Sequence, residues 1–338
     1  MSNETPGPSR LAGSVYMLAA AAFWGGMFPV AKSLLQIVDP FFLTLIRYAV
    51  TFIVMVVILW TAEGRSSLRA DGRGWSLFLY GSIGFCGFGL FVFSGLRAST
   101  PAHGAILVAL MPMITAVITS LVSRRMPPGA TQVSIAIALI GVALVVSNGH
   151  PRELLQSRSL GADAMILFGV VSWVVYTLAA KNFDGWSPLR YTTLTIGYGV
   201  IGIAVCTVLA SVFGLAHVPS VAQAGDAAPY FVYVVIFASV LAVLGWNEGV
   251  RRIGPVNGVL FINFVPITAF LIQAAQGRPL HPVELAGAAL VASALLLNNF
   301  LQRRSIRGAV DLPAAKDGPL CVSTLVAFDI AATPRSQK

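Results

Sequence analysis

Ten long stretches of this sequence are apolar and nearly free of charge. A transmembrane helix needs about 20 apolar residues in a row, and each stretch has about that length. Short connectors join the stretches, so nearly the whole chain is predicted to lie in a membrane or at its surface. The predicted helices span residues 12–34, 39–61, 75–96, 101–123, 130–148, 161–181, 189–213, 228–250, 255–275 and 283–302.

The composition excludes a water-soluble domain. Hydrophobic residues make up 57% of the 338 residues and charged residues only 10%, whereas soluble domains carry about 25% charged residues. The first stretch is not a cleaved signal peptide, because it continues through Trp24 and Pro29 without an Ala-x-Ala cleavage pattern. The predicted fold class is therefore an all-α polytopic membrane protein.

The three cysteines do not form a recognisable framework. Cys86 and Cys206 fall inside apolar stretches, and Cys321 lies near the C-terminus. We expect reduced, isolated thiols rather than disulfides or metal ligands. No metal or cofactor is predicted.

The basic residues predict the orientation of the chain. With the N-terminus in the cytoplasm, thirteen Lys and Arg residues fall on the cytoplasmic side, before Lys316, Arg335 and Lys338 of the tail are counted, and five fall on the opposite side. By the positive-inside rule, both termini are cytoplasmic. The net charge of +9 thus reports orientation and does not indicate nucleic-acid binding, since the basic residues cluster at helix ends. We expect residues 303–338 to form a disordered cytoplasmic tail.

One pattern of glycine, proline and arginine occurs twice at a constant offset of 154 residues. A weaker match at an offset of 149 pairs Trp24 with Trp173 and Lys32 with Lys181. The stronger match pairs Gly95, Arg97, Pro101, Gly104, Pro112 and Arg124 with Gly249, Arg251, Pro255, Gly258, Pro266 and Arg278.

These matches predict two five-helix repeats, residues 12–148 and 161–302, around a central cavity. An odd number of helices forces the second copy to enter the membrane from the opposite face. Residues 1–11 are then a cytoplasmic N-terminus and residues 149–160 an extracytoplasmic linker. Inverted repeats place a substrate site near the midplane and allow alternating access, which is typical of secondary transporters. The alternative is a duplication that serves only to build a stable bundle.

The sequence resembles the ten-helix EamA-type branch of the drug/metabolite transporter superfamily. The resemblance covers about residues 12–302 and rests on Trp24 with Pro29, on the Pro40-x-x-Leu43-x-x-x-Arg47 opening of the second helix, and on the Pro-x-x-Gly-x7-Pro block in the fourth and ninth. Within that branch it is most similar to YddG-type exporters of amino acids, including aromatic ones. The family usually ends the fourth and ninth helices with Gly-Glu. This chain has Arg at the corresponding positions, so no role of that Glu carries over.

Glycines and prolines predict flexible regions in the fourth and ninth helices. Pro112 and Pro266 each remove one backbone hydrogen bond in mid-helix. Gly104 and Gly258 precede them by about two turns. We interpret the two pairs as symmetric hinges, and the alternative is a pair of static kinks.

Aromatic, amide and imidazole side chains are the candidates for substrate binding. The resemblance implies that several of the segments that carry these side chains face a central cavity. Each aromatic residue is equally suited to packing or to the lipid interface. The amides are equally suited to hydrogen bonds between helices. The predicted substrate-binding residues are Trp24, Phe28, Tyr80, His103, Trp173, Tyr176, Trp246, Asn247, Phe261 and Asn263.

A carboxylate suited to proton coupling is hard to find in the sequence. Asp39, Asp163 and Glu284 fall at the ends of predicted helices. His103 carries the one imidazole in the predicted membrane segments, and imidazole changes charge near neutral pH in water. The sequence therefore favours a facilitator, with proton exchange as the alternative. Arg47 is expected to snorkel or to bond neighbouring carbonyl groups.

The predicted function is a secondary transporter that exports amino acids or related small metabolites across a bacterial inner membrane. A proton-coupled multidrug or metabolite efflux carrier, a channel and a lipid flippase are alternatives. Enzymes are disfavoured because zinc-protease, membrane-protease and phosphate-loop motifs are missing from the sequence. The expected partners are a small molecule and the lipid bilayer, and the expected state is a monomer or a weak homodimer.

Overall fold

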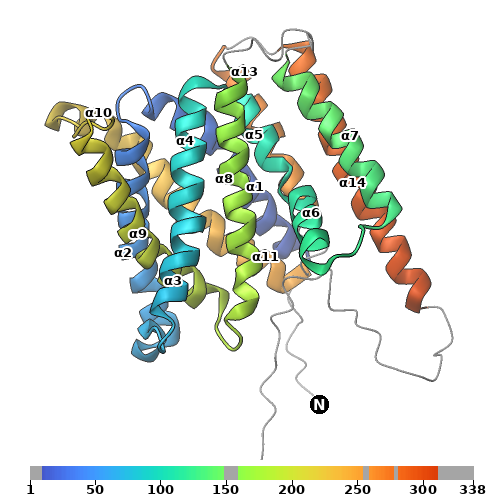
Figure 1. The fold of residues 1–338 in the computed structure, drawn as a ribbon, viewed down its shortest axis with the longest axis horizontal. Coiled ribbons are helices and arrows are strands. Elements are labelled where there is room, and N and C mark those ends of the chain that lie inside the picture. The colour runs from blue at the N-terminus through green and yellow to red at the C-terminus, as the bar shows by residue number, and fades with distance from the viewer. Residues whose placement is uncertain (1–9, 148–158, 254–258, 278–280, 311–338) are drawn as a thin grey trace, which may run out of the picture.

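The chain folds into helices packed side by side (Figure 1). The computed structural model describes residues 10–147, 159–253, 259–277 and 281–310, and within these ranges no strand occurs. Pro255, Gly258, Arg278 and Cys321, which carry predictions made above, lie outside the described residues.

The first half of the chain contains the first five predicted helices, two of them divided into shorter pieces. Its helical elements are α1 (Arg10–Leu34), α2 (Pro40–Glu63), η1 (Arg65–Leu68), α3 (Gly74–Gly81), η2 (Ser82–Gly87), α4 (Phe88–Ala98), α5 (Pro101–Ala109), α6 (Met111–Ser123) and α7 (Gly129–Val146).

The second half is divided in a similar way. Its elements are α8 (Ser159–Ala179), η4 (Ala180–Asn182), α9 (Pro188–Val212), α10 (Val221–Val232), η5 (Tyr233–Leu241), α11 (Ala242–Ile253), η6 (Val259–Asn263), α13 (Phe264–Ala275) and α14 (Pro282–Val310).

Several of these helices are long and apolar enough to cross a membrane. Six spans within the described ranges meet both conditions, and a seventh is added if α5 and α6, bent by 42° at their junction, count as one. Large apolar side chains such as Ile53, Leu121 and Val212 are exposed on the surface, as expected where lipid is the solvent. The chain is a helical membrane protein, and membrane crossing by the shorter helices α7, α13 and α14 stays a prediction.

Local sequence signals set where several helices begin. Asp39 caps α2, because its Oδ1 accepts hydrogen bonds from the backbone nitrogens of Phe41 and Phe42 at 2.8 and 3.0 Å. Pro40 occupies the first turn of α2, where a missing N–H costs nothing. Ser187 caps α9 in the same way, and Pro188 follows it.

Two helices contain a wide π-helical segment that the sequence analysis did not predict. The predicted helix 75–96 is interrupted by η2, and the predicted helix 228–250 by η5. A π segment weakens the regular backbone ladder, so its carbonyl groups become available to side chains. In η5, Ser239 Oγ donates to the Val234 carbonyl at 2.7 Å, and Trp24 Nε1 donates to the Ala238 carbonyl at 3.1 Å.

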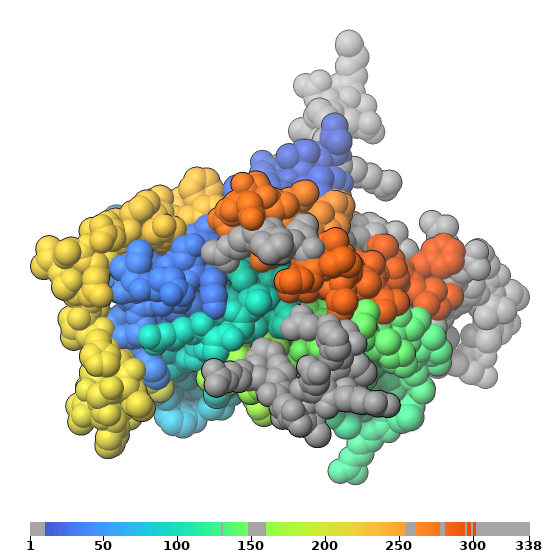
Figure 2. Space-filling view, turned by 90° about the horizontal axis from the view of Figure 1, so that it is seen from above, coloured from blue at the N-terminus to red at the C-terminus, as the bar shows by residue number. Residues whose placement is uncertain are grey.

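The helices pack in a pattern that joins the two halves of the chain. The principal pairs are α4 with α8, α1 with α11, α2 with α9, and α7 with α14. In the space-filling view (Figure 2), α9 and α10 lie at one end of the molecule, and α7 and α14 lie together at the other. Residues of α1 and α5 lie between these ends, so the candidate site is built in the middle of the bundle.

Glycines allow two helix pairs, α3 with α9 and α7 with α14, to approach until their backbones touch. A Cβ atom on Gly81 of α3 would clash with the Thr195 carbonyl oxygen of α9, and one on Gly199 would lie 2.6 Å from the Gly81 oxygen. Likewise, a Cβ atom on Gly141 of α7 would lie 2.8 Å from the Gly287 oxygen of α14. Small residues at such crossings are typical of membrane helices.

Two expectations need correction. Helix α14 continues to Val310, eight residues past the predicted end at 302, because polar residues at 303–307 end the apolar stretch without interrupting a helix. Cys86 and Cys206 are free thiols, but they are not isolated, since their sulfur atoms lie 3.8 Å apart. Sequence spacing does not reveal this contact between η2 and α9.

Candidate functional site

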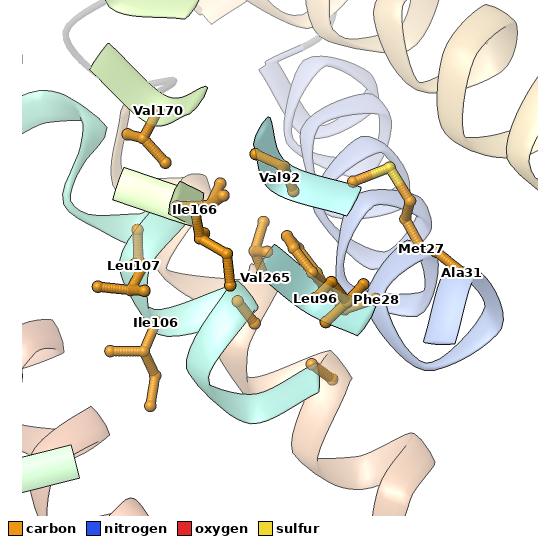
Figure 3. Packing of buried hydrophobic residues seen from close by; sticks show 14 of the residues in the cluster. Met27, Phe28, Ala31, Val92, Leu96, Ile106, Leu107, Ile166, Val170 and Val265 are labelled. Atoms are coloured by element: carbon orange, nitrogen blue, oxygen red, sulfur yellow. The ribbon is translucent and has the colours of Figure 1, made fainter. Parts of the chain in front are cut away.

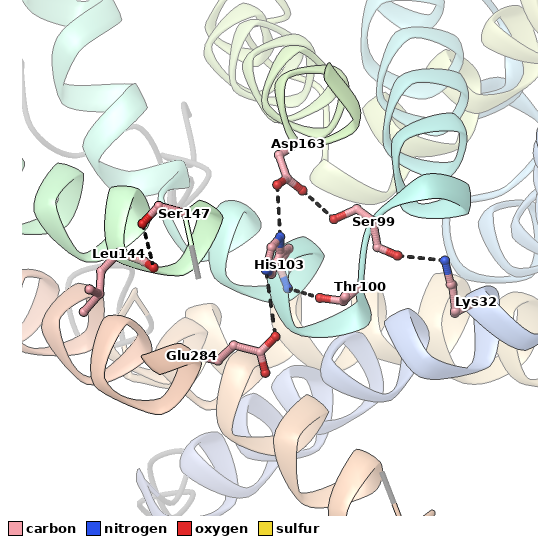
Figure 4. Close-up of polar contacts among 8 residues, drawn as sticks. All are labelled: Lys32, Ser99, Thr100, His103, Leu144, Ser147, Asp163 and Glu284. Atoms are coloured by element: carbon pink, nitrogen blue, oxygen red, sulfur yellow. Dashed lines mark hydrogen bonds and ion pairs between the residues drawn. The ribbon is translucent and has the colours of Figure 1, made fainter. Parts of the chain in front are cut away.

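A buried cluster of ionisable side chains joins three helices near the start of α5 (Figure 4). His103 of α5 places Nδ1 3.0 Å from Oδ2 of Asp163 in α8, and Nε2 3.8 Å from Oε1 of Glu284 in α14. Ser99, just before α5, donates a short hydrogen bond to the other carboxylate oxygen of Asp163. We refer to His103, Asp163, Glu284 and Ser99 as the polar cluster.

The turn between α4 and α5 positions this cluster. Thr100 caps α5, because its Oγ1 accepts a hydrogen bond from the His103 backbone nitrogen at 3.2 Å. Pro101 opens α5. Lys32 at the end of α1 donates to the carbonyl oxygens of Leu96, Arg97 and Ser99 at 2.7–2.9 Å, so a cation stabilises the C-terminal end of α4.

The cluster is almost completely shielded from solvent. The exposed fractions are 2% for His103, 3% for Asp163 and 6% for Glu284. His103 was a predicted site residue, whereas both acids were predicted only to lie at helix ends, where the structure does place them. Each acid does lie in the first turns of an apolar helix, but on a face turned into the bundle. One signal in the sequence could have predicted the cluster, because His103, Asp163 and Glu284 all fall at the same predicted membrane surface.

The residues of the cluster do not form a recognisable metal site. Among the described residues, no group of three or more His, Cys, Asp or Glu side chains has a geometry that could hold a metal ion. An imidazole and two carboxylates are groups that can bind protons and polar ligands.

Two of the predicted binding residues meet at the contact between α1 and α11. The rings of Trp24 and Trp246 lie 5.2 Å apart between centroids, and both side chains are half-buried. Asn247, next along α11, is also half-buried.

A second group of predicted residues belongs to a different aromatic cluster. Trp173 lies 5.2 Å from Phe88 and 5.6 Å from Phe85, between ring centroids. Tyr176 stacks on Tyr191 at 5.1 Å. The structure thus brings Trp173 and Tyr176 together, with ring centroids 5.2 Å apart.

Tyr80 lies near the C-terminal end of α3, whereas the polar cluster begins at Ser99, after the C-terminal end of α4. Its ring packs edge-on against Phe183 at 6.2 Å, and its hydroxyl accepts a hydrogen bond from Asn182 at 3.1 Å. These contacts give Tyr80 a structural role in this conformation.

Phe28 fills the core (Figure 3). Only 1% of the residue is exposed. A Cβ atom on Gly104 would lie 2.7 Å from the Phe28 ring, so Gly104 lets α5 approach α1 closely. This close packing explains why a glycine occupies position 104 and does not require a hinge there.

Asn263 lies on an apolar groove between α5, α13 and α14. The groove has a volume of about 420 Å³ and includes Ile106, Pro266 and Leu285 in its wall. Asn263 is the one polar residue among those that line it. Ile106 and Leu285 follow His103 and Glu284 in the sequence by three residues and one residue, so the groove runs beside the polar cluster. Phe261 packs against Phe264 at 6.2 Å.

Both prolines of the predicted hinges follow a change in helix geometry. The bend between α5 and α6 falls at Leu110, two residues before Pro112. The 3-10 turn η6 gives way to α13 at Phe264, two residues before Pro266. The predicted kink near Pro112 is confirmed, and motion at either proline stays a prediction.

Arg47 is buried, and the expectation that it snorkels or bonds carbonyl groups is wrong. Its exposed fraction is 4%, and Nε donates to Ser239 Oγ in η5 at 2.8 Å. Its guanidinium carbon lies 4.8 Å from the Tyr48 ring centroid and 5.4 Å from that of Phe93. Arg47 thus ties α2 to the wide segment of the other half. At the surface, Glu248 pairs with Arg251 and Arg252 at 2.6 Å.

Comparison with known proteins gives one family. The model of the EamA-like transporter family matches residues 11–147 and again residues 160–300. The uncharacterised transporter YrdR of Bacillus subtilis is 34% identical over 296 residues, which are 86% of this chain and 92% of that protein. The uncharacterised transporter YyaM of the same organism is 30% identical over 280 residues, covering 82% of this chain and 90% of YyaM.

More distant relatives include a protein with a named substrate and a solved structure. The aromatic amino acid exporter YddG of Ancylobacter novellus is 25% identical over 311 residues, covering 87% of this chain and all of that protein. A solved crystal structure with 22% identity superposes with a TM-score of 0.62, covering 88% of this chain and all of the other. At that identity, the superposition shows the fold alone.

Proposed function

Because this chain belongs to the EamA-like transporter family, within the drug/metabolite transporter superfamily, we propose that it exports amino acids or related small metabolites across a bacterial inner membrane by alternating access. The substrate class is supported by the named substrate of the YddG relative. It is also supported by the aromatic rings and amides on the inner helices, which suit a zwitterion with an apolar side chain.

The observation that carries alternating access is a structural correspondence between the two wide helical segments. Adding the sequence offset of 154 to Ser82–Gly87 gives 236–241, which is the last part of η5. In Figure 1, α3 lies below α4, whereas α10 lies above α11. The two matching segments therefore run in opposite directions, as inverted repeats require.

Two further correspondences support the same repeat. The break at Leu110 corresponds by the same offset to Phe264, where α13 begins. The repeat partners Trp24 and Trp173 each contact the wide segment of the opposite half, at Ala238 and at Phe85. Each half of such a repeat can adopt either of two conformations. If the two halves exchange these conformations, a central site opens to one side of the membrane and then to the other.

The proposed orientation makes a labelling prediction. Ser66 in η1 and Val218 in the α9–α10 connector are exposed at opposite ends of the helices. In a background with the three native cysteines replaced by alanine, a membrane-impermeant maleimide should label Val218→Cys in intact cells. It should label Ser66→Cys only after the membrane is broken. The reverse pattern would overturn the orientation.

The transport proposal is tested by counterflow in proteoliposomes. Vesicles loaded with unlabelled L-phenylalanine should take up external labelled L-phenylalanine with a transient overshoot, because a carrier exchanges one molecule for another. Uptake should saturate with concentration. Flux that rises without saturation would favour a channel, and labelled lipid that changes leaflet while the amino acid does not move would favour a flippase.

A further inference from the structure

We propose that the polar cluster is the proton-binding site through which export is coupled to the proton gradient. This inference rests on the proposed transport function and adds the coupling ion and the residues that bind it. It replaces the facilitator that the sequence alone favoured.

Burial and charge together indicate that the cluster holds exchangeable protons. With both carboxylates ionised and the imidazole neutral, it would carry two negative charges in a site nearly closed to water. Charges in such surroundings are stable only when paired. One proton on His103 would place a cation against Asp163 and near Glu284, and a second would leave the cluster neutral. Each proton thus changes how strongly the three helices attract one another.

The charged groups around His103 form a small set. Helix α8 contributes Asp163 and α14 contributes Glu284, while Lys32 of α1 reaches the backbone of Ser99. The described sequences of α6, α7 and α13, which also lie near α5, contain no Asp, Glu, Lys, Arg or His. Helix α4, which also packs against α5, carries the exposed Arg97 in its last turn. Within the part of the chain that the structure describes, the charge of the cluster therefore depends on His103 and the two acids, with Lys32 as the nearby fixed cation.

The position of the cluster connects proton binding to movement. Asp163 and Glu284 are contributed by the second half of the chain, whereas His103 and Ser99 belong to the first. The cluster lies where α1 and α4 end and where α5, α8 and α14 begin, at the predicted extracytoplasmic surface. If α5 separates from α8 and α14 when the transporter opens outward, the contacts to His103 break and each group meets water.

The proposed cycle balances protons against substrate. In the outward-open state, the separated cluster takes up a proton from the extracytoplasmic water after substrate has left. In the inward-open state, the central cavity that is then open to the cytoplasm would reach the inner side of the cluster, and the cluster would release that proton into this cavity as substrate binds. One proton enters for each substrate molecule exported.

Transport with and without a gradient tests this coupling. In proteoliposomes, a gradient of about two pH units should drive L-phenylalanine to accumulate at least about tenfold against its own gradient, since each pH unit is worth about a factor of ten. Nigericin should abolish the accumulation. Asp163→Asn and Glu284→Gln should each lose it and retain counterflow, because exchange needs no net proton movement. Wild-type accumulation that is unaffected by nigericin would overturn the proposal, as would gradient-driven accumulation retained by both variants.

A substrate-free measurement separates this inference from the transport function. Infrared difference spectra of the purified protein between pH 5 and pH 9 should contain the carbonyl band of a protonated carboxyl group that Asp163→Asn or Glu284→Gln removes. The matched control is Asp71→Asn, whose carboxylate pairs with Arg190 at the surface at 2.6 Å. Asn tolerates the positive φ of 47° at that position.

The spectra have two decisive outcomes. Bands lost in the cluster variants and kept in the control would support the proton site even if L-phenylalanine proves not to be a substrate. A carboxyl band that is identical in the wild type and in both cluster variants would overturn it, whatever the transport assay shows.

Discussion

Replacing Gly81 with alanine is expected to lower the free energy of unfolding by about 3 kcal/mol, at the upper end of ordinary overpacking costs. The added methyl group would clash with the Thr195 carbonyl oxygen and lie 2.9 Å from the Gly199 nitrogen. Both atoms belong to the backbone of α9, so no side-chain rotation relieves the clash and α3 must move away. Thermal unfolding of the purified protein, followed by tryptophan fluorescence, measures the loss.

Gly225→Ala is the matched control. A Cβ atom at Gly225 of α10 meets nothing within 4 Å, so alanine there should be neutral or slightly stabilising through its better helix propensity. Equal stability of Gly81→Ala and Gly225→Ala would show that α3 and α9 do not approach as closely as described.

Replacing His103 with leucine is expected to destabilise the protein by about 3–5 kcal/mol, the usual cost of removing one partner from a buried ionic group. Asp163 would lose its contact at 3.0 Å and Glu284 its contact at 3.8 Å. Both acids would stay nearly inaccessible to water. The same unfolding measurement applies.

Neutral replacements of the acids provide the decisive comparison. Adding Asp163→Asn and Glu284→Gln to His103→Leu should recover part of the lost stability, because no buried charge then remains unpaired. His217→Leu, at an exposed histidine of the α9–α10 connector, should change little. A triple variant less stable than His103→Leu alone would show that the electrostatic account is wrong.

The sequence predicted the helices well, because in a membrane the length of an apolar stretch nearly determines a helix. Starts such as Pro40, Pro101 and Pro188 fall within one residue of the predicted positions, since proline and its capping neighbour act locally. The end of α14 was missed because its last residues are polar and lie past the apolar stretch that defined the prediction.

Contacts between helices were harder to predict. Asp163 and Glu284 could face water at a helix end or face the inside of the bundle, depending on the direction of the side chain. The position of a residue along its helix does not give that direction. The burial of Arg47 against Ser239 depends in the same way on how α2 crosses η5. We recognise no local sequence motif that predicts the wide segments η2 and η5, and we attribute them to packing.

The matched wide segments carry a historical consequence. If the proposed repeat is correct, both halves carry a π segment at the same offset. The simplest explanation is one inserted residue that both halves inherited from a common ancestor, so that the insertion is older than the gene duplication. That ancestor would have been a single five-helix chain that already carried the irregularity, and it would have paired with an antiparallel copy of itself. The polar cluster is not repeated in the sequence, because the position 154 residues after His103 is Asn257. Ion coupling through it would therefore have arisen only after the copies were fused and free to diverge.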